Sequence, residues 1–242
     1  MGVSRAALLG FPPMHLHPPA RPEVRPGSPG DPPREPAPGP KSRVRVWLVR
    51  HGEVDEAFAE HAYGSRDVPL SPRGEEQTLA AAEALAAAEI QRIVTSPLQR
   101  AQSLGEAIAT RSGGELRIDP RLGEVDRGEW QGLGRSEYLA RWEEQAEEYW
   151  NDPAHWRGHG GESEADLCTR TWAAFEEATS GVSRLVIAAH RNVVRSILAC
   201  ALGLPYGQSH ALSLDPIHGA LLKGGESGWT LIRFGAGPEA GP

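Results

Sequence analysis

Short apolar runs alternate with stretches of helical periodicity from residue 44 onward, and this alternation predicts an α/β fold. The apolar runs that predict strands are 44–49, 93–95, 116–119, 184–189, 220–223 and 229–234. Helical patterns lie between them, at 71–88, from 96 onward, within 136–156, from 163 onward and from 191 to about 203. We therefore expect a three-layer sandwich, with a mainly parallel central sheet and helices on both of its faces.

Local signals support several of these helices. Ser71 is a suitable N-cap with Pro72 in the first turn, and Ser163 with Asp166 resembles a capping box. Apolar spacing predicts one buried face formed by Leu79, Ala82 and Ala86, and a second formed by Ala101, Leu104 and Ile108. A third face, Cys168, Trp172 and Phe175, makes Cys168 a core residue rather than a catalytic one.

The chain divides into a tail and one domain. Residues 1–42 are rich in Pro, Gly and Arg, have little to build a core, and are expected to form a disordered tail. Residues 43–242 are expected to form a single domain, with a flexible end from 235 to 242. Within it, 136–160 is acidic and aromatic and predicts one or two short helices, either a cap-like insertion over the site or a plain surface insertion.

Charge and composition exclude several classes of partner. The net charge of −7 does not suit a nucleic-acid-binding surface. No apolar run approaches the roughly 20 residues that span a bilayer, so no membrane partner is expected. The two cysteines form no disulfide framework or close metal-ligand pair, which fits a cytoplasmic protein.

Polar residues follow four of the predicted strands. Arg50 and His51 come directly after the first, Arg100 opens the helix after the second, Glu124 lies in a glycine-rich loop after the third, and His190 ends the strand 184–189. Because parallel strands end at one edge of a sheet, these side chains are expected to meet there. Taken singly, each has a plainer interpretation: a polar strand end, an exposed arginine or a solvated acidic turn.

Together, these residue types suit phosphoryl transfer. The guanidinium groups match phosphate oxygens, an imidazole can attack phosphorus, and a carboxylic acid can protonate the leaving oxygen. Gly52 has no Cβ, so the backbone there can approach a ligand closely. Arg191 either adds charge for a polyanionic substrate or faces solvent, and we favour solvent slightly.

The order and spacing of five motifs resemble the histidine phosphatase superfamily, in its phosphoglycerate mutase-like branch. The similarity runs from about residue 44 to 234. It rests on Arg50-His51-Gly52-Glu53, Ser96-Pro97-Leu98-Gln99-Arg100-Ala101, Leu122-Gly123-Glu124 with Gly128-Glu129-Trp130-Gln131-Gly132, Gly160-Gly161-Glu162-Ser163, and Ala189-His190. The resemblance implies the fold predicted above and an enzyme that needs no cofactor and no metal.

The resemblance also implies roles. His51 would be the nucleophile that forms a phosphohistidine, and Glu124 the general acid and then the base. Arg50, Arg100 and His190 would bind the phosphoryl group and its transition state. We predict catalytic roles for these five residues, and substrate binding by Arg50, Gly52, Arg100, His190 and Arg191.

Two departures from the family pattern stand out. The family commonly has Ser or Thr after this first motif and then an Asn that contacts phosphate, whereas Val54 to Phe58 follow here. After its second histidine the family often has Gly, whereas Arg191 follows here.

We predict a phosphomonoesterase that acts on a small phosphorylated metabolite. One alternative is phosphotransfer of the phosphoglycerate mutase type, which typically comes with a longer insertion after the loop that carries Glu124, called the acid loop below. The other is a non-catalytic module that binds phosphorylated ligands. The sequence does not indicate the natural substrate or the oligomeric state.

Overall fold

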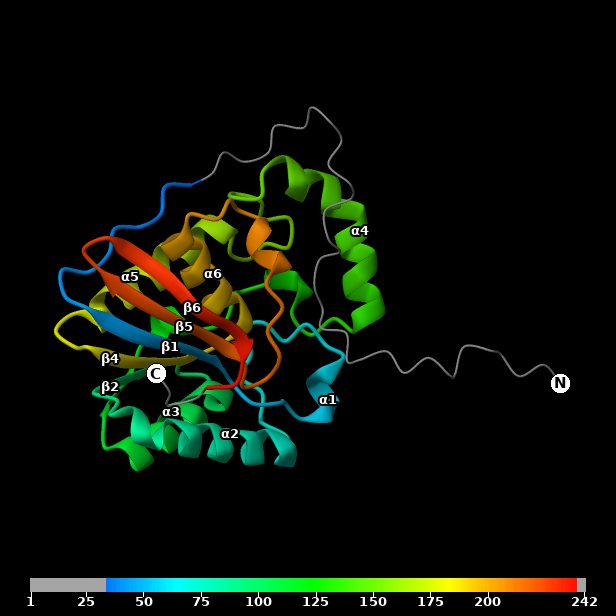
Figure 1. The fold of residues 1–242 in the computed structure, drawn as a ribbon. Helices are drawn as coiled ribbons and strands as arrows, with labels where there is room; N and C mark the ends of the chain where they lie inside the picture. Colours follow the sequence, from blue (N-terminus) through cyan, green and yellow to red (C-terminus); the bar gives the residue numbers. More distant parts are fainter. Residues whose placement is uncertain (1–33, 239–242) are drawn as a thin grey trace.

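A computed structural model describes residues 34–238 and shows a central sheet with helices on either side (Figure 1). In chain order the elements are β1 (Val44–Arg50), α1 (Glu56–Ala59), α2 (Pro72–Leu85), β2 (Arg92–Thr95), α3 (Gln99–Ser112), β3 (Glu115–Ile118), α4 (Arg135–Asn151), α5 (Glu164–Thr179), β4 (Arg184–Ala189), α6 (Arg191–Leu202), β5 (Gly219–Gly225) and β6 (Gly228–Ala236). Short 3-10 turns cover Ala86–Ala88, Pro120–Leu122, Gly128–Trp130 and Gln208–Ala211. The predicted three-layer α/β architecture is confirmed.

The sheet has the strand order β3-β2-β4-β1-β5-β6. β1, β2, β3 and β4 run parallel to one another, whereas β5 is antiparallel to β1 and β6 is antiparallel to β5. The two late strands therefore form a hairpin at one edge of an otherwise parallel sheet. As a result, the carboxyl ends of β2, β4 and β1 lie side by side at one edge, where open α/β sheets place their ligands.

Alternate residues of β1 enter opposite hydrophobic layers. Leu48 belongs to one buried cluster with Phe175 of α5 and Ile197 of α6, whereas Trp47 belongs to a second cluster with Leu104 of α3. Helices α5 and α6 therefore cover one face of the sheet and α2 and α3 the other, as Figure 1 shows. The strand has to be apolar on both faces, which is why it reads as a continuous apolar run.

The helix signals in the sequence are mostly confirmed. The Ser71 side chain accepts a hydrogen bond from the Gly74 N–H, and Ser163 with Asp166 forms a full capping box. Ala101, Leu104 and Ile108 are completely buried. The prediction for Leu79 is wrong, because 51% of this residue is exposed. The face of α2 that packs on the sheet is rotated from the predicted one and comprises Gly74, Thr78, Ala81, Ala82 and Leu85.

The 136–160 region, predicted to contain one or two short helices, contains one long helix, α4, which ends at Asn151 and is followed by turns. Its aromatic side chains build a small hydrophobic cluster apart from the two main layers, with Tyr138, Trp142 and Tyr149 packed around Trp130. Their rings meet mostly edge to face, for example Trp142 and Tyr149 with centroids 4.9 Å apart. The run of aromatic residues in an acidic segment is thereby explained as a local core.

Both ends of the described chain differ from the sequence prediction. Residues 1–33, most of the predicted tail, lie outside the described residues. Residues 34–42 form no helix or strand but do contact the domain, since the Ala37 N–H donates to the Cys200 carbonyl at 3.0 Å. At the other end β6 continues to Ala236, so the predicted loose end at Gly235 begins too early.

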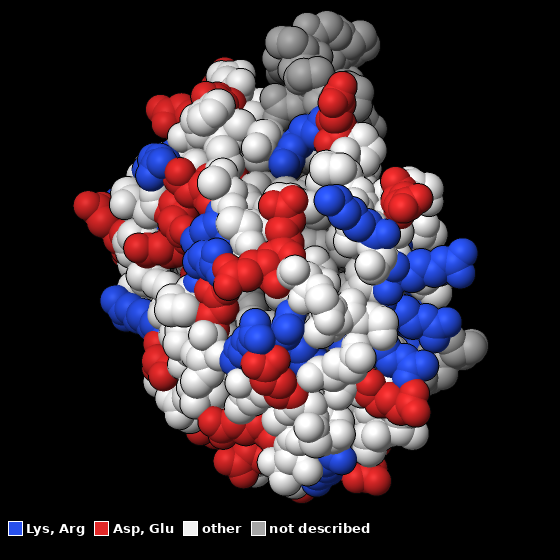
Figure 2. All heavy atoms as spheres, turned by 90° about the vertical axis from the view of Figure 1, so that its left-hand side faces the viewer, with Lys and Arg blue, Asp and Glu red and all other residues white. Residues whose placement is uncertain are grey.

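On the face shown in Figure 2, basic and acidic side chains are interspersed, and several basic side chains lie together along its right-hand side. Within residues 34–238, no helix combines the length and apolar character needed to cross a bilayer.

Candidate active site

The end of β1 places Arg50 and His51 at the centre of the carboxyl edge, and both side chains are buried. The His51 N–H donates to the Ala189 carbonyl at 3.0 Å, which links the ends of β1 and β4. The His51 Nδ1 lies 2.6 Å from the Gly52 carbonyl oxygen. Because a carbonyl can only accept, Nδ1 carries the ring proton in this contact and Nε2 keeps its lone pair.

Gly52 is required by a close approach of two backbones. A Cβ at Gly52 would lie 2.4 Å from the carbonyl oxygen of Gly74, which belongs to the first turn of α2. A Cβ at Gly74 would in turn lie 2.0 Å from the Glu53 carbonyl oxygen. The start of α2 therefore packs directly on the backbone that follows His51, and the Gly in Arg-His-Gly is needed for packing.

His190 reaches the same point from β4. It is the N-cap residue of α6 and is fully buried, and its ring centroid lies 5.2 Å from that of His51. Its Nε2 lies 2.7 Å from the Ser96 hydroxyl oxygen, the first residue after β2. The ends of β1, β2 and β4 thus bring the side chains of His51, Ser96 and His190 together. The sequence predicted this meeting for His51 and His190.

Arg50 and Arg100 are held by backbone carbonyls. Arg50 Nη1 donates to the Leu214 carbonyl at 2.7 Å. Arg100 donates to the carbonyls of Arg66 at 2.7 Å and Gly64 at 2.9 Å, and its guanidinium carbon lies 5.0 Å from the Tyr63 ring centroid. The partners of Arg100 come from the segment between α1 and α2, whereas Leu214 precedes β5. Neutral carbonyls orient the arginines but do not cancel their charge.

Arg191 does not simply face solvent, so the slightly favoured interpretation is wrong. Its side chain is half-buried at the start of α6, and its Nε is buried without a hydrogen-bond partner among the residues that the structure describes. Its pKa is lowered well below the usual value, first by burial and then by the charge of Arg50, whereas Glu124 acts in the opposite direction. Arg191 therefore belongs to the cationic group around His51.

Glu124 is buried in the loop that follows the turn Pro120–Leu122. Its Oε1 accepts from the Val125 N–H at 2.8 Å, and its Oε2 accepts from the Asn192 N–H at 3.3 Å. The second contact ties the carboxyl group to the first turn of α6, where unpaired N–H groups favour an anion. All the predicted site residues are thus gathered at one edge of the sheet.

The site is electrostatically prepared for an anion. The pKa values of His51 and His190 are lowered well below the usual imidazole value, mainly by burial and then by the arginines beside them. Burial also lowers the pKa of Arg100. Each shift reflects positive charge that is poorly solvated. A bound dianion would offset this cost, because its oxygens supply the missing negative charge.

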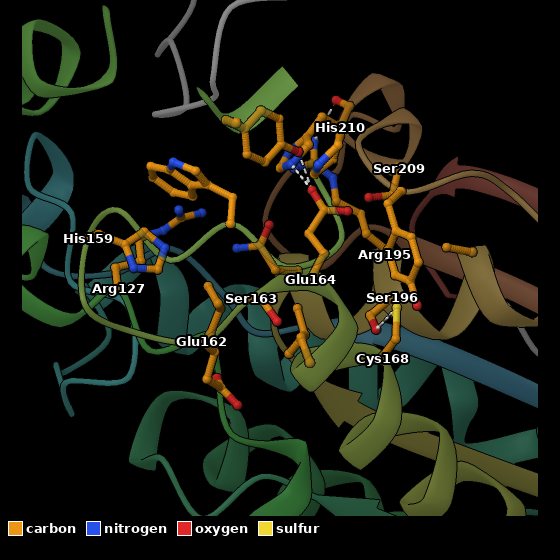
Figure 3. Close-up of a pocket in the computed structure, with 18 of the residues that line it drawn as sticks. Arg127, His159, Glu162, Ser163, Glu164, Cys168, Arg195, Ser196, Ser209 and His210 are labelled. Carbon is orange, nitrogen blue, oxygen red and sulfur yellow. Dashed lines mark hydrogen bonds and ion pairs between the residues drawn. The ribbon is translucent and has the colours of Figure 1, made fainter. Parts of the chain in front are cut away.

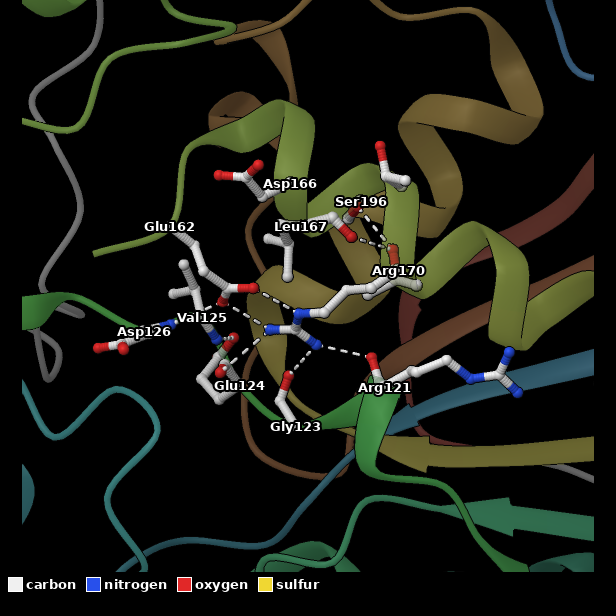
Figure 4. A network of polar contacts seen from close by, with 12 residues as sticks. Arg121, Gly123, Glu124, Val125, Asp126, Glu162, Asp166, Leu167, Arg170 and Ser196 are labelled. Carbon is white, nitrogen blue, oxygen red and sulfur yellow. Dashed lines mark hydrogen bonds and ion pairs between the residues drawn. The ribbon is translucent and has the colours of Figure 1, made fainter. Parts of the chain in front are cut away.

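Residues that were not among the sequence-based candidates also support this group. Ser96 was noted only as part of a motif, although it stands directly after β2 in the same position that singled out the other candidates. Glu162 and Arg170 were not considered for the site, although Arg170 bonds the backbone of the acid loop (Figure 4). No short-range pattern connects Arg170 with Glu124, since they are brought together by the packing of α5.

A pocket adjoins the acid loop, with an empty volume of about 670 Å³ that includes space open to solvent. Val125 and Asn192, whose N–H groups both bond the Glu124 carboxylate, are part of its wall. Figure 3 shows Arg127 and His159 on one side of the pocket and Arg195 and His210 on the other. Aromatic side chains of α4 line it as well, so it offers both apolar surface and polar groups next to the loop that carries Glu124, whereas Glu124 itself is not part of its wall.

The sequence is similar to that of known proteins over most of its length. The family model of the histidine phosphatase superfamily (branch 1) matches residues 46–237. A glucosyl-3-phosphoglycerate phosphatase of Mycolicibacterium vanbaalenii is 36% identical over 170 residues, which cover 66% of this chain and 75% of the relative. A probable phosphoglycerate mutase of Salmonella choleraesuis is 31% identical over 194 residues, which cover 77% of this chain and 87% of the relative.

Solved structures give the same result. The structure of a mycobacterial glucosyl-3-phosphoglycerate phosphatase superimposes with a TM-score of 0.71 at 30% sequence identity, and covers 81% of this chain and all of that chain. The chain therefore belongs to the histidine phosphatase superfamily, in its phosphoglycerate mutase-like branch. It is an enzyme of the phosphatase class, as the sequence analysis predicted.

Proposed function

We propose that this protein hydrolyses a phosphate monoester through a phosphohistidine formed on His51. The observation that carries the proposal is the state of the His51 ring. Its Nδ1 is occupied by the Gly52 carbonyl, its Nε2 keeps the lone pair, and its pKa is lowered so that the ring is neutral at neutral pH. A neutral imidazole surrounded by arginines suits attack on a bound anion.

The two chemical steps use the same groups. His51 Nε2 attacks phosphorus while the bond to the leaving oxygen breaks, and Glu124 gives its proton to that oxygen. Water then attacks phosphorus as the phosphorus–nitrogen bond breaks, Glu124 takes a proton from the water, and inorganic phosphate and free His51 result. Arg50, Arg100, Arg191 and His190 bind the phosphoryl oxygens in both transition states, together with the backbone at Gly52. The arginines supply the positive charge that a metal would otherwise provide.

We propose a phosphorylated sugar acid as the substrate, of the type named for the mycobacterial relatives. Identities of 36% and 32% to two glucosyl-3-phosphoglycerate phosphatases support this choice. The pocket next to the loop that carries Glu124 supports it as well, because the part of the substrate that departs has to lie on the side of the acid. Aromatic rings, arginines and histidines around that pocket suit a polar leaving group with apolar faces.

The test is hydrolysis of glucosyl-3-phosphoglycerate and p-nitrophenyl phosphate in EDTA, with inorganic phosphate as the readout. We expect activity on both to persist in EDTA, and kcat/KM to be at least about tenfold higher for the sugar acid, because its remote groups add binding energy. Loss of all activity in EDTA would contradict the arginine-based mechanism. Equal kcat/KM for the two substrates would contradict the proposed substrate only.

The mutase alternative is kept because a probable phosphoglycerate mutase is 31% identical. A mutase has to keep the phosphoryl group away from water between its two transfer steps. Conversion of 3-phosphoglycerate to its 2-isomer faster than release of inorganic phosphate would favour this alternative. We expect release of inorganic phosphate to be faster than this conversion.

The buried histidines predict a specific pH dependence. Since their pKa values are lowered in the folded protein, the rings of His51 and His190 should stay neutral at pH 6. Their contribution to stability is present above the unfolded value near 6.5 and is lost as the pH falls through the folded pKa values. NMR titration of ring-labelled histidines, assigned with single His→Asn variants, would check this. Midpoints near 6.5 for both rings would contradict it.

A further inference from the structure

The loop that carries Glu124 is held by one side chain of another element. Residues 121–128 form no strand and no α-helix, yet the carbonyls of Arg121, Gly123 and Glu124 all point at Arg170 of α5 (Figure 4). Arg170 Nη1 donates to the first two at 2.6 and 2.8 Å, and Nη2 donates to the third at 3.3 Å. Three anchor points of the acid loop therefore depend on one guanidinium.

The remaining donors of this guanidinium go to Glu162. Arg170 Nε donates to Oε1 at 2.6 Å and Nη2 donates to Oε2 at 2.7 Å, so the pair is bidentate. Glu162 Oε2 also accepts from the Asp126 N–H at 2.9 Å, and the Glu162 N–H donates to the Asp126 carbonyl at 2.9 Å. All five N–H donors of Arg170 are used. The loop is fixed before Glu124 by Arg170 and after it by Glu162.

Close backbone packing strengthens this arrangement. A Cβ at Gly161 would lie 2.2 Å from the Asp126 carbonyl oxygen, and a Cβ at Gly128, whose φ is +47°, would lie 2.1 Å from the His159 carbonyl oxygen. Only glycine allows the segments 126–128 and 159–161 to approach this closely. The Gly-Gly-Glu-Ser motif, which the catalytic assignments leave unused, thereby acquires a role in placing the acid loop.

We propose that Arg170, oriented by Glu162, is the positioning residue that holds Glu124 at the leaving oxygen of the substrate. This inference rests on the proposed function, because it needs Glu124 as the acid. Arg170 bonds the backbone of the loop rather than the Glu124 carboxylate. Arg170 therefore determines the position of Glu124. A small displacement of Glu124 would slow proton transfer, because the acid has to lie within hydrogen-bond distance of the leaving oxygen.

The ion pair is intact at neutral pH. Burial opposes ionisation of Glu162, but the hydrogen bonds from Arg170 and from the Asp126 N–H lower its pKa overall. Arg170 also contributes to the lowered pKa of His190 through its charge. Lysine at position 170 would keep the charge but lose the planar fork. This substitution therefore separates the positioning effect from the electrostatic one.

The experiment compares kcat/KM for an alkyl phosphate ester and for p-nitrophenyl phosphate in wild type, Arg170→Lys and Glu162→Gln. We expect Arg170→Lys to lower kcat/KM about 10- to 100-fold for the alkyl ester and less than about threefold for p-nitrophenyl phosphate. The reason is that p-nitrophenolate leaves without protonation. Glu162→Gln, which leaves one carbonyl oxygen for Arg170, should show the same pattern more weakly.

Arg121→Lys is the matched control. Arg121 lies in the same loop, but its side chain pairs with Asp119 and Glu177 and does not contact the acid. We expect this variant to match wild type on both esters. Thermal unfolding and circular dichroism of every variant identify those that fail to fold. If Arg170→Lys does not fold, Glu162→Gln carries the test.

Equal slowing of both esters by Arg170→Lys, or no slowing, would overturn the inference. The double variant Glu124→Gln/Arg170→Lys should be no slower on the alkyl ester than Glu124→Gln alone, because an absent acid cannot be misplaced. If Glu124→Gln itself shows no dependence on the leaving group, the acid assignment in the proposed function fails. If Glu124→Gln slows the alkyl ester more than p-nitrophenyl phosphate and Arg170→Lys does not, only the positioning role fails.

Discussion

Replacing His51 with alanine should lower kcat by at least about 10⁴-fold, because the step that forms the phosphorus–nitrogen bond is then lost. His190 cannot readily replace it, since its Nε2 is engaged with Ser96 and its Nδ1 is buried. The measurement is release of inorganic phosphate from p-nitrophenyl phosphate. Rapid acid-free quenching of wild type with labelled substrate should place the label on His51.

The fold of this variant should survive. His51 stands at the end of β1 rather than in either hydrophobic layer. His51→Asn is a useful second variant, because an amide can still donate to the Gly52 carbonyl. The control is His155→Ala, which removes an exposed histidine paired with Asp152. A His51→Ala protein with near wild-type turnover would exclude the phosphohistidine mechanism.

Replacing Glu124 with glutamine should lower kcat/KM about 10²- to 10⁴-fold for an alkyl phosphate ester, the range that general acid catalysis contributes. For p-nitrophenyl phosphate the loss should stay below about tenfold, because that leaving group needs no proton. The change conserves shape, and the amide oxygen can still accept from the N–H groups of Val125 or Asn192. The quantity kcat/KM is chosen because it reports steps up to departure of the leaving group.

A second readout isolates the role of Glu124 as a base. With p-nitrophenyl phosphate, the Glu124→Gln variant should show a burst of p-nitrophenolate followed by a slow steady state, because the phosphohistidine still forms but its hydrolysis lacks the base. Glu129→Gln, an exposed carboxylate in the same loop, is the control. Equal losses on both esters together with the absence of a burst would remove Glu124 from both roles.

The parallel sheet and the meeting point of the candidate side chains could be predicted because both follow from local patterns. The apolar run before Arg50 is buried on both faces, and a parallel sheet brings the residues after β1, β2 and β4 to one edge. The positions of His51, Arg100 and His190 therefore needed only correct identification of the strands. The order of these residues along the chain then showed which of them follows which strand.

Contacts that depend on packing between distant elements could not be predicted in this way. The periodicity that placed Leu79 in the core ignores the angle at which α2 lies on the sheet, and half of that side chain is exposed. Arg191 was expected at the surface because nothing near it in sequence buries it. Arg170 lies 46 residues from Glu124, and only the packing of α5 against the acid loop shows that one holds the other.

Arg34 lies in the segment that precedes β1, and its contacts affect the chemistry of the two cysteines. Its guanidinium lies over the Tyr206 ring, and its two terminal nitrogens donate to the sulfur atoms of Cys168 and Cys200, the two cysteines of the chain. Hydrogen bonds from Cys200, Ser196 and Arg34 lower the pKa of Cys168 to about 6, against the effect of burial. These hydrogen bonds therefore favour the thiolate form of Cys168.

Shortening the protein to begin at residue 41 would remove this cation from both sulfur atoms. The choice of first residue would then decide how strongly the purified protein reacts with alkylating reagents and how readily it is oxidised in storage. A segment without helix or strand thus contributes to lowering the pKa of a side chain 134 positions further along the chain.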